Sequence, residues 1–277
     1  MFIFVYIKVE IMSLPKTIPS IQSLKQSAKL LASTKNIQLS QALDLVANEY
    51  GFTHWTLFLK YFKSIRINNI ESLWQSFLPG EMILLSAPEG AGKMSLALNV
   101  AAYAAKKYES VKYFSMHVNA SCIIERLNKI VDPNLVGDWL TRQYLTVEER
   151  SFEQKTLIEE IQNNKPGGLL IIDYLQAIKS HDGTDPYHDF LQKIKLIAQQ
   201  HASRVLILSQ INEESSVDSL DYIAGGRSIG KHFSHAIHIE QQHIENRNHR
   251  GIVLVKSIHY QKQKSLLQFN NENYRFV

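Results

Sequence analysis

The clearest candidate for chemistry in the sequence is a glycine-bearing stretch that ends in lysine, Ala87-Pro88-Glu89-Gly90-Ala91-Gly92-Lys93-Met94. Closely spaced small residues let successive backbone N–H groups converge on a phosphate, and the lysine can reach the outer phosphates. Ala87 replaces the usual first glycine, and Met94 replaces the Ser or Thr whose hydroxyl would bind Mg²⁺. The stretch predicts a phosphate-binding loop. Its expected ligand contacts are Glu89, Gly90, Ala91, Gly92, Lys93, Met94 and Ser95.

Two further polar side chains follow apolar runs. Asp173 ends the run over 167–172, eighty residues after Lys93, and Gln210 follows the run over 204–209. An isolated Asp at a strand end more often caps a helix, but in company with a phosphate loop it is better interpreted as part of a Mg²⁺ shell. The amide of Gln210 is suited to sensing a terminal phosphate.

A parallel sheet is needed to bring these residues together. Short apolar runs alternate with helical patterns, the runs covering 82–86, 111–115, 168–173 and 204–209. Such alternation is typical of a parallel sheet covered by helices on both faces. Later runs alternate apolar and polar residues in the manner of antiparallel strands, at 235–240, 251–256 and 265–269. The predicted fold class is α/β, with a mainly parallel sheet and antiparallel C-terminal strands. Tyr113, Phe114 and Tyr174 are expected in its core.

Residues 13–65 predict a small helical module ahead of this domain. One helix face is formed by Ile21, Leu24, Ala28 and Leu31. Ser40 is expected to cap a second helix that ends at Gly51, and Thr53 a third. Three short helices can bind nucleic acid or pack on a neighbour, and periodicity alone favours packing.

Four segments together resemble a known family. They read PGEMILLSAPEGAGKMSLALNVA, VKYFSMHVNASCIIERL, LLIIDYLQAI and VLILSQIN. In this order and spacing they are similar to the motor domain of hexameric replicative helicases of the DnaB type, within the RecA-like P-loop ATPases. The resemblance covers about residues 71–277, and IDYLQ followed by SQIN is specific to that group. The helical module resembles one that precedes helicase-like and some glyoxalase-related domains in bacteria, and differs from the helicases' primase-interacting domain.

The resemblance implies ATP and Mg²⁺ as cofactors, and it assigns roles to individual residues. Lys93 would contact the β- and γ-phosphates, and Gln210 would sense phosphate. Asp173 would belong to the Mg²⁺ shell, with Ser95 as a weak replacement for the missing hydroxyl. Ser95 follows Met94 by about 100 degrees around the helix, so it would need a shift of the loop.

The same resemblance places two more residues in the hydrolytic machinery. His117 stands where the family has the Glu that activates the attacking water. Lys256 matches a Lys that reaches the nucleotide of a neighbouring subunit, but Ile258 replaces its companion Arg. An arginine finger is worth roughly a thousandfold or more in rate in related sites. With Met94, three replacements fall on hydrolysis, so the motifs are degenerate and turnover is expected to be weak or absent.

Two functions therefore remain open. The first is a DnaB-like P-loop protein that binds ATP, acts on or near DNA and forms a labile ring or filament. The second is a non-hydrolysing adaptor that docks on a partner ATPase or scaffold. Charge fits a polyanion partner, because residues 13–65 carry +4, residues 66–223 carry −5 and residues 224–277 carry +5. Solvated lysines on ordinary surfaces explain the same counts equally well.

Composition narrows the class of protein further. A chain of 277 residues with 45% hydrophobic and 20% charged positions is typical of a globular protein. The single Cys122 excludes a disulfide framework, and the expected compartment is the cytoplasm. Residues 1–12 are interpreted as a leader, because translation from Met12 would omit residues 1–11. Their apolar run is far shorter than the roughly 18–20 residues of a membrane span.

Six of the eleven histidines follow residue 230. The spacing of His232, His235 and His238 could suit a helical metal site. Without acidic or cysteine partners in the sequence pattern, polar surface positions at the entry to a strand explain them better.

Overall fold

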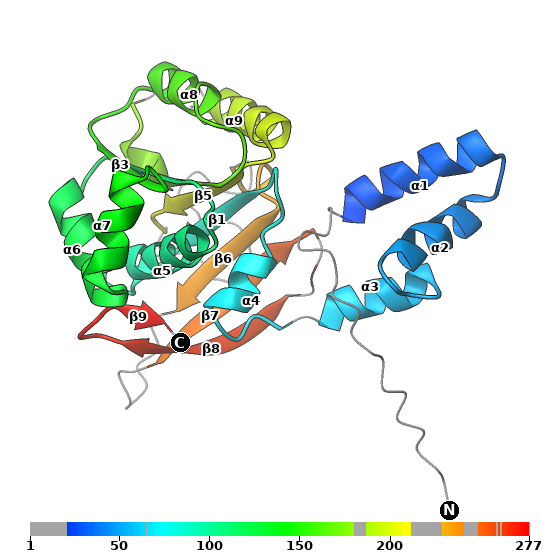
Figure 1. Ribbon diagram of the computed structural model, residues 1–277, viewed down its shortest axis with the longest axis horizontal. Helices are drawn as coiled ribbons and strands as arrows, with labels where there is room; N and C mark the ends of the chain where they lie inside the picture. The colour runs from blue at the N-terminus through cyan, green and yellow to red at the C-terminus, as the bar shows by residue number, and fades with distance from the viewer. Residues whose placement is uncertain are drawn as a thin grey trace, which may run out of the picture. The chain divides into compact units, whose positions relative to one another are not determined.

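Two compact units divide the chain in the computed structural model, one over Met1–Ser64 and the other over Ile65–Val277 (Figure 1). The structure describes residues 21–64, 66–179, 187–211, 229–240, 249–258, 260 and 262–276. The expected leader lies outside the described residues. Within these ranges, no helix combines the length and the apolar character that crossing a membrane requires.

Helices α1 (Ile21–Lys35), α2 (Leu39–Glu49) and α3 (Trp55–Ser64) form the described part of the smaller unit. Its buried side chains include Leu24 and Ala28, as the helical spacing predicted. The capping role expected for Ser40 is wrong, because α2 already begins at Leu39. The side chain of Gln41 instead accepts a hydrogen bond from the backbone N–H of Gln38 at 3.2 Å.

The ends of α2 and α3 depend on two different features. Gly51 follows α2 with a φ of +80°, as predicted for a helix stop. The cap expected from Thr53 is wrong, because α3 begins at Trp55 and the backbone N–H of Trp55 donates to Asp44 Oδ1 at 2.8 Å. Asp44 lies in the preceding helix, so local sequence around Thr53 does not reveal this cap.

A sheet organises the larger unit, with nine strands among its described residues in the order β3-β2-β4-β5-β1-β6-β7-β8-β9. The strands are β1 (Met82–Ser86), β2 (Val111–Ser115), β3 (Leu145–Glu149), β4 (Leu169–Asp173), β5 (Arg204–Ser209), β6 (His235–Glu240), β7 (His249–Ser257), β8 (Gln263–Asn270) and β9 (Arg275–Phe276). The helices are α4 (Ile70–Gln75), α5 (Lys93–Lys106), α6 (Ala120–Ile130), α7 (Pro133–Thr141), α8 (Gln154–Gln162), the 3₁₀ turn η1 (Leu175–Ala177) and α9 (His188–His201). The predicted α/β class is confirmed.

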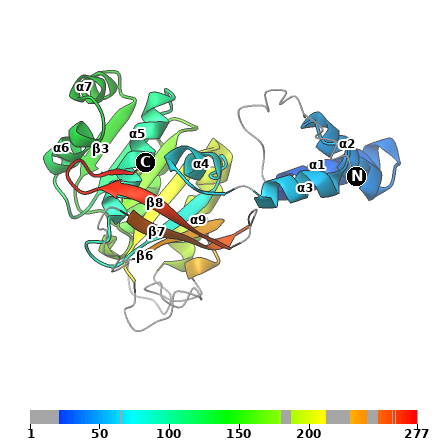
Figure 2. The same cartoon turned by 90° about the horizontal axis from the view of Figure 1, so that it is seen from below.

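Strand β1 lies at the centre of the sheet. It pairs in parallel with β5 and with β6, so that Leu84 is level with Ile207 on one side and Ala236 on the other. The antiparallel prediction for β6 is therefore wrong on its β1 side and correct on its β7 side. Figure 2 shows β6, β7 and β8 following one another in this antiparallel part.

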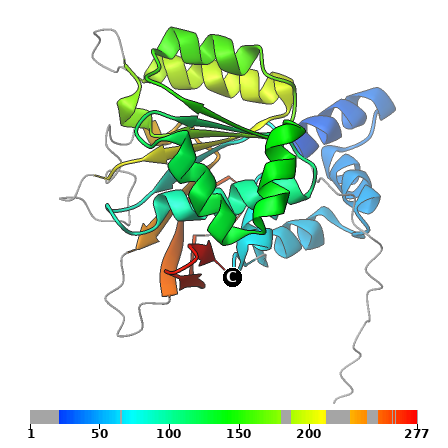
Figure 3. The same cartoon turned by 60° about the vertical axis from the view of Figure 1, so that its left-hand side comes forward.

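Helices cover both faces of the sheet. Figure 3 shows α8 and α9 in green and yellow on one face, with α5, α6 and α7 on the other. The core on the α8 and α9 side includes Leu84, Ile172 and Ile207 from the central strands and Leu157 and Ile194 from the helices. Since β1, β4 and β5 are buried throughout, their sequences are continuous apolar runs rather than alternating ones.

Two strands were missed by the sequence analysis. Strand β3 pairs in parallel with β2 at the edge of the sheet, and its sequence LTVEE ends in two glutamates that weaken the apolar signal. Strand β9 has two residues and pairs with β8. Short edge strands carry little pattern, so their position depends on pairing that local sequence does not encode.

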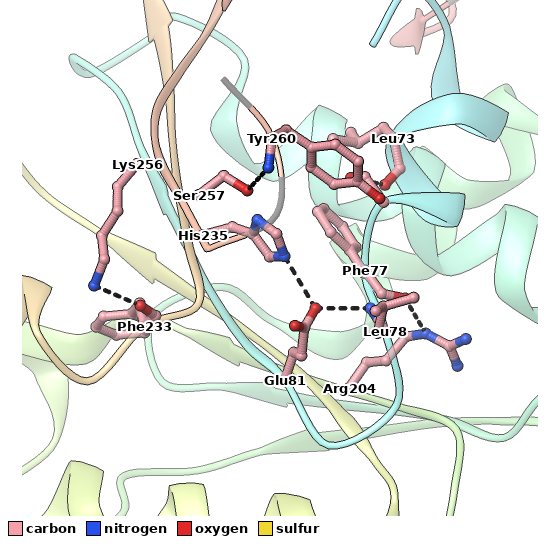
Figure 4. Close-up of polar contacts among 11 residues, drawn as sticks. Leu73, Phe77, Leu78, Glu81, Arg204, Phe233, His235, Lys256, Ser257 and Tyr260 are labelled. Atoms are coloured by element: carbon pink, nitrogen blue, oxygen red, sulfur yellow. Dashed lines mark hydrogen bonds and ion pairs between the residues drawn. The ribbon is translucent and has the colours of Figure 1, made fainter. Parts of the chain in front are cut away.

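A buried polar group lies at the beginning of β1 (Figure 4). Glu81 Oε2 accepts hydrogen bonds from the backbone N–H of Leu78 at 2.8 Å and from His235 Nε2 at 2.9 Å. Only 4% of Glu81 and 1% of His235 are exposed. The expected surface position of the histidines is therefore wrong, since His238 is also buried, and His235 has the acidic partner that the sequence did not reveal. Among the described residues, no cluster of three His, Cys, Asp or Glu could hold a metal.

Candidate functional site

The glycine-bearing loop connects the central strand β1 to helix α5, as predicted. Strand β1 ends at Ser86 and α5 begins at Lys93, while Gly90 and Gly92 have φ values of +74° and +101°. Residues with side chains rarely adopt these values, so the turn needs glycine at both positions. A Cβ on Gly92 would also lie 3.7 Å from the ring of Phe276. The loop therefore presents backbone N–H groups at the N-terminus of a 14-residue helix, which is an arrangement suited to anions.

Lys93 is held inside this loop. Its Nζ donates a hydrogen bond to the carbonyl of Ala87 at 3.1 Å. Burial lowers the pKa of Lys93, while the negative charges of Asp173 and Glu89 act to raise it. Glu89 itself is exposed in the loop, where its charge opposes the approach of a phosphate.

Asp173 lies at the end of β4, where the sequence predicted a carboxylate, and only 7% of it is exposed. Its Oδ2 accepts a hydrogen bond of 2.6 Å from the hydroxyl of Tyr113 on β2. Burial raises the pKa of Asp173, and the Tyr113 hydroxyl together with the charges of Lys93, His117 and Arg126 partly opposes this rise. Tyr113 was expected only as a core residue; it is fully buried, but it also orients the carboxylate.

A Mg²⁺ ion does not fit the side chains at this position. Mg²⁺ prefers a regular shell of oxygen ligands, and the position of the usual hydroxyl is taken by the thioether of Met94. Arg126 Nη1 lies 3.0 Å from that sulfur, which brings a positive charge to the same place. Ser95 is buried in the first turn of α5. Asp173 is thus left without the hydroxyl ligand that usually accompanies it, and the charge of Arg126 acts on its carboxylate.

Two glutamine side chains follow β4 and β5. Gln176, in the turn after β4, donates through Nε2 to Ser209 Oγ at 2.8 Å and accepts from the backbone N–H of Gln210 at 3.1 Å. Gln210 is exposed just after β5. Gln176 therefore ties together the strand ends that carry Asp173 and Gln210. The sequence contains it in IDYLQ, but only the fold reveals this bridge.

His117 and His238 lie near the loop in different ways. His117 is exposed after β2, its ring centroid 5.9 Å from that of Tyr174, and its charge acts on Asp173. His238 lies within β6, level with Ser86 at the end of β1, and its Nδ1 is 3.2 Å from Ser86 Oγ. Burial and the charge of Lys93 lower the pKa of His238 to about 4, against the effect of Glu240. His238 is therefore neutral at physiological pH and lies next to the loop without adding charge.

Lys256 lies away from the loop. It is level with Ala236 at the beginning of β6, whereas the loop follows the end of the parallel strand β1. Its Nζ donates to the carbonyls of Gly230 at 2.8 Å and Phe233 at 2.7 Å, the latter drawn in Figure 4. The structure thus brings the loop, Asp173, His117 and Gln210 to the carboxyl ends of the parallel strands, whereas Lys256 lies on β7 and is bonded to backbone carbonyls that precede β6.

No protein-family model matches the chain. A probable replicative DNA helicase from Trieres chinensis is 23% identical over 236 residues, covering 68% of this chain and 48% of the helicase, so the chain spans about half the length of that curated relative. A DnaB-like replicative helicase, solved in a study of its interactions with primase, matches with a TM-score of 0.66 and 14% identity, over 92% of this chain and 75% of the helicase.

Two further solved structures share the fold. The RadB recombinase matches with a TM-score of 0.55 and 17% identity, over 73% of this chain and 92% of its own. A KaiC-like protein from Pyrococcus horikoshii matches with a TM-score of 0.58 and 14% identity, over 73% of this chain and 90% of its own. The larger unit therefore has a RecA-like fold. It is similar in sequence and in fold to DnaB-type replicative helicases, which is the resemblance that the sequence motifs indicated.

Proposed function

We propose that the chain binds ATP through its phosphate loop and acts on or near DNA as a DnaB-like P-loop protein with slow or lost hydrolysis. The observation that carries this proposal is the loop itself, with Gly90 and Gly92 at positive φ and Lys93 at the start of α5. A loop of this shape can place several N–H donors around a phosphate. Lys93 then adds a charge-assisted hydrogen bond.

Slow hydrolysis follows from the groups around the loop. His117 is exposed where the DnaB resemblance places a water-activating carboxylate, and an imidazole ring lacks the two acceptor oxygens with which a carboxylate orients water. Met94 supplies no oxygen for a metal. Gln210, near the end of β5, remains suited to sensing a phosphate.

A role near DNA and assembly into a labile ring or filament are parts of the same proposal. The probable helicase from Trieres chinensis supports the first, together with the positive charge at both ends of the sequence. Lys256 supports the second, because its Nζ is bonded to the carbonyls of Gly230 and Phe233 and not to its own phosphate loop, and the DnaB resemblance assigns it to the nucleotide of a neighbouring copy. Ile258, where an arginine would strengthen that contact, is 45% exposed.

Calorimetry with ATP tests nucleotide binding. The wild type should bind, Lys93→Ala should weaken the affinity by about tenfold or more through loss of a charged contact, and Lys155→Ala, an exposed lysine on α8, should leave it unchanged. Absence of binding by the wild type at millimolar ATP would refute the proposal.

Fluorescence anisotropy with labelled DNA tests the proposed role near DNA. Affinity should fall as salt rises, because neutralising phosphates releases counterions. Reversing the charges of Lys25, Lys29 and Lys35 on α1 should weaken binding. Undiminished affinity in that variant, or independence of salt, would remove the role assigned to the basic ends.

The adaptor is a second candidate function, and the smaller unit favours it. Leu30 on α1 and Leu57 on α3 are large apolar side chains that remain 70% and 49% exposed on that unit, so each is available to contact a partner protein. Measured turnover separates the candidates. ATP hydrolysis that DNA stimulates and Lys93→Ala abolishes supports the helicase-like function, whereas binding without turnover supports the adaptor.

A further inference from the structure

Arg126 lies beside the position where a P-loop protein usually holds its metal. It belongs to α6, which packs against α5 on the same face of the sheet (Figure 3). Its Nη1 is 3.0 Å from the sulfur of Met94, the second residue of α5. A thioether is a weak acceptor, so this contact leaves the donors of the guanidinium available to a stronger one.

The charge of Arg126 is not neutralised by its contacts. Besides Met94, it packs on the ring of Tyr274 at 5.3 Å from guanidinium carbon to ring centroid. Within the described part of the chain, no carboxylate lies at ion-pair distance from it. It is nevertheless close enough to Asp173 and Tyr113 for its charge to lower the pKa of both groups. The guanidinium therefore adds a positive charge to the same region as Lys93.

The C-terminal strands hold Arg126 in this place. The carbonyl of Tyr274 accepts a hydrogen bond from Asn99 Nδ2 at 2.8 Å, and the backbone N–H of Phe276 donates to Asn99 Oδ1 at 3.1 Å. Asn99 lies on α5 and is buried. The ring beneath the guanidinium is thus tied to the helix that begins at the phosphate loop, which pre-positions the charge.

We propose that Arg126 takes the place of Mg²⁺ at this site, so that the chain binds the metal-free polyphosphate of a nucleotide, with the guanidinium bonded to phosphate oxygens. Guanidinium groups bond phosphates in a fixed, often bidentate geometry. Here the group stands beside a thioether that cannot serve Mg²⁺, and its charge repels a second cation. The inference rests on the proposed ATP binding and deepens it by naming the ionic form of the ligand.

Calorimetric titration of the full chain with ATP, in excess EDTA and in excess MgCl₂, tests this inference. We expect the two dissociation constants to agree within about twofold, because no metal contact is lost. Arg126→Ala should weaken binding in EDTA by about tenfold or more, and Arg126→Lys should recover part of that loss. Lys129→Ala is the matched control, because Lys129 lies one turn later on α6, 5.6 Å from the same Tyr274 ring, and is paired with Glu125. It should change the affinity by less than about twofold.

The outcomes separate this inference from the proposal on which it rests. ATP binding that is tight in MgCl₂ and lost in EDTA would overturn the inference and leave nucleotide binding intact. Unchanged affinity in Arg126→Ala would overturn it as well, whereas absence of binding in both buffers would overturn both proposals. Circular dichroism would reveal whether Arg126→Ala is unfolded. In that case the dissociation constants of the wild type in EDTA and in MgCl₂ still decide whether binding requires a metal.

Discussion

The hydroxyl of Tyr113 donates a 2.6 Å hydrogen bond to Asp173 across two adjacent strands, and both groups are buried. Burial raises the pKa of Asp173, while this bond lowers it. The pair therefore sets how readily the carboxylate at the centre of the site stays ionised.

Tyr113→Phe should raise the pKa of Asp173 further and lower the free energy of unfolding by about 1.5–3 kcal/mol at neutral pH, because a buried carboxylate loses a donor. The pKa of Asp173 is higher in the folded protein than in the unfolded chain, where it is about 3.9. The protonated carboxyl therefore contributes stability below a pH of about 3.9, and this contribution is lost as the pH rises through the pKa of the folded protein. The difference in the free energy of unfolding between the variant and the wild type should therefore become smaller as the pH falls. Urea titrations at several pH values measure it. Tyr144→Phe, whose ring packs on Tyr108, is the control, and an equal loss there would contradict the prediction.

His117→Glu should raise the rate of ATP hydrolysis, and more so when combined with Met94→Thr. A positioned general base contributes about 10²- to 10⁴-fold in rate, so we expect at least about a tenfold gain from an imperfectly placed one. Steady-state phosphate release measures the change. Fast, DNA-stimulated hydrolysis by the unmodified protein would show instead that His117 is a working replacement.

Glu89→Gln should tighten ATP binding, because it removes an exposed negative charge from the phosphate loop. The gain should be about twofold to fivefold at low salt and should fade at high salt, where exposed charges are screened. Glu159→Gln, an exposed glutamate on α8, should have no effect. Equal gains in the two variants would indicate a general effect of net charge.

Glu81→Ala should destabilise the larger unit by about 3 kcal/mol, because it leaves the backbone N–H of Leu78 and the ring of His235 buried without their acceptor. Glu81→Gln should cost less, since its amide oxygen can still accept one bond. Chemical denaturation measures both. Glu125→Ala, which breaks an exposed pair with Lys129, should cost below about 1 kcal/mol, and a similar cost for Glu81→Ala would mean that the buried pair contributes little.

The central strands and the phosphate loop could be predicted because their signals are local. A continuous apolar run followed by Gly90, Gly92 and Lys93 specifies strand, turn and helix without knowledge of the rest of the chain. Asp173 could be added because parallel strands end at one edge of a sheet. The order and spacing of these parts along the chain then supported the resemblance to DnaB-type motor domains.

Other features depend on partners far along the chain. The contacts of Tyr113 with Asp173, His235 with Glu81 and Arg126 with Met94 join residues 60, 154 and 32 positions apart. Periodicity predicts that Tyr113 is a core residue and that the histidines lie at the surface. It does not predict which polar side chains form hydrogen bonds with one another in the folded protein. The prediction that Thr53 caps α3 is wrong for the same reason, because the cap comes from Asp44 in the preceding helix.

The bonds from Asn99 to Tyr274 and Phe276 span 175 and 177 positions. During synthesis from the N-terminus, α5 and its phosphate loop leave the ribosome long before their buried partner exists. The bonds of Asn99 to Tyr274 and Phe276 can form only after almost the whole larger unit has been synthesised, and contacts between such distant residues form slowly. A nascent chain halted before residue 274 would therefore carry the phosphate loop and α5 without their tie to the C-terminal segment.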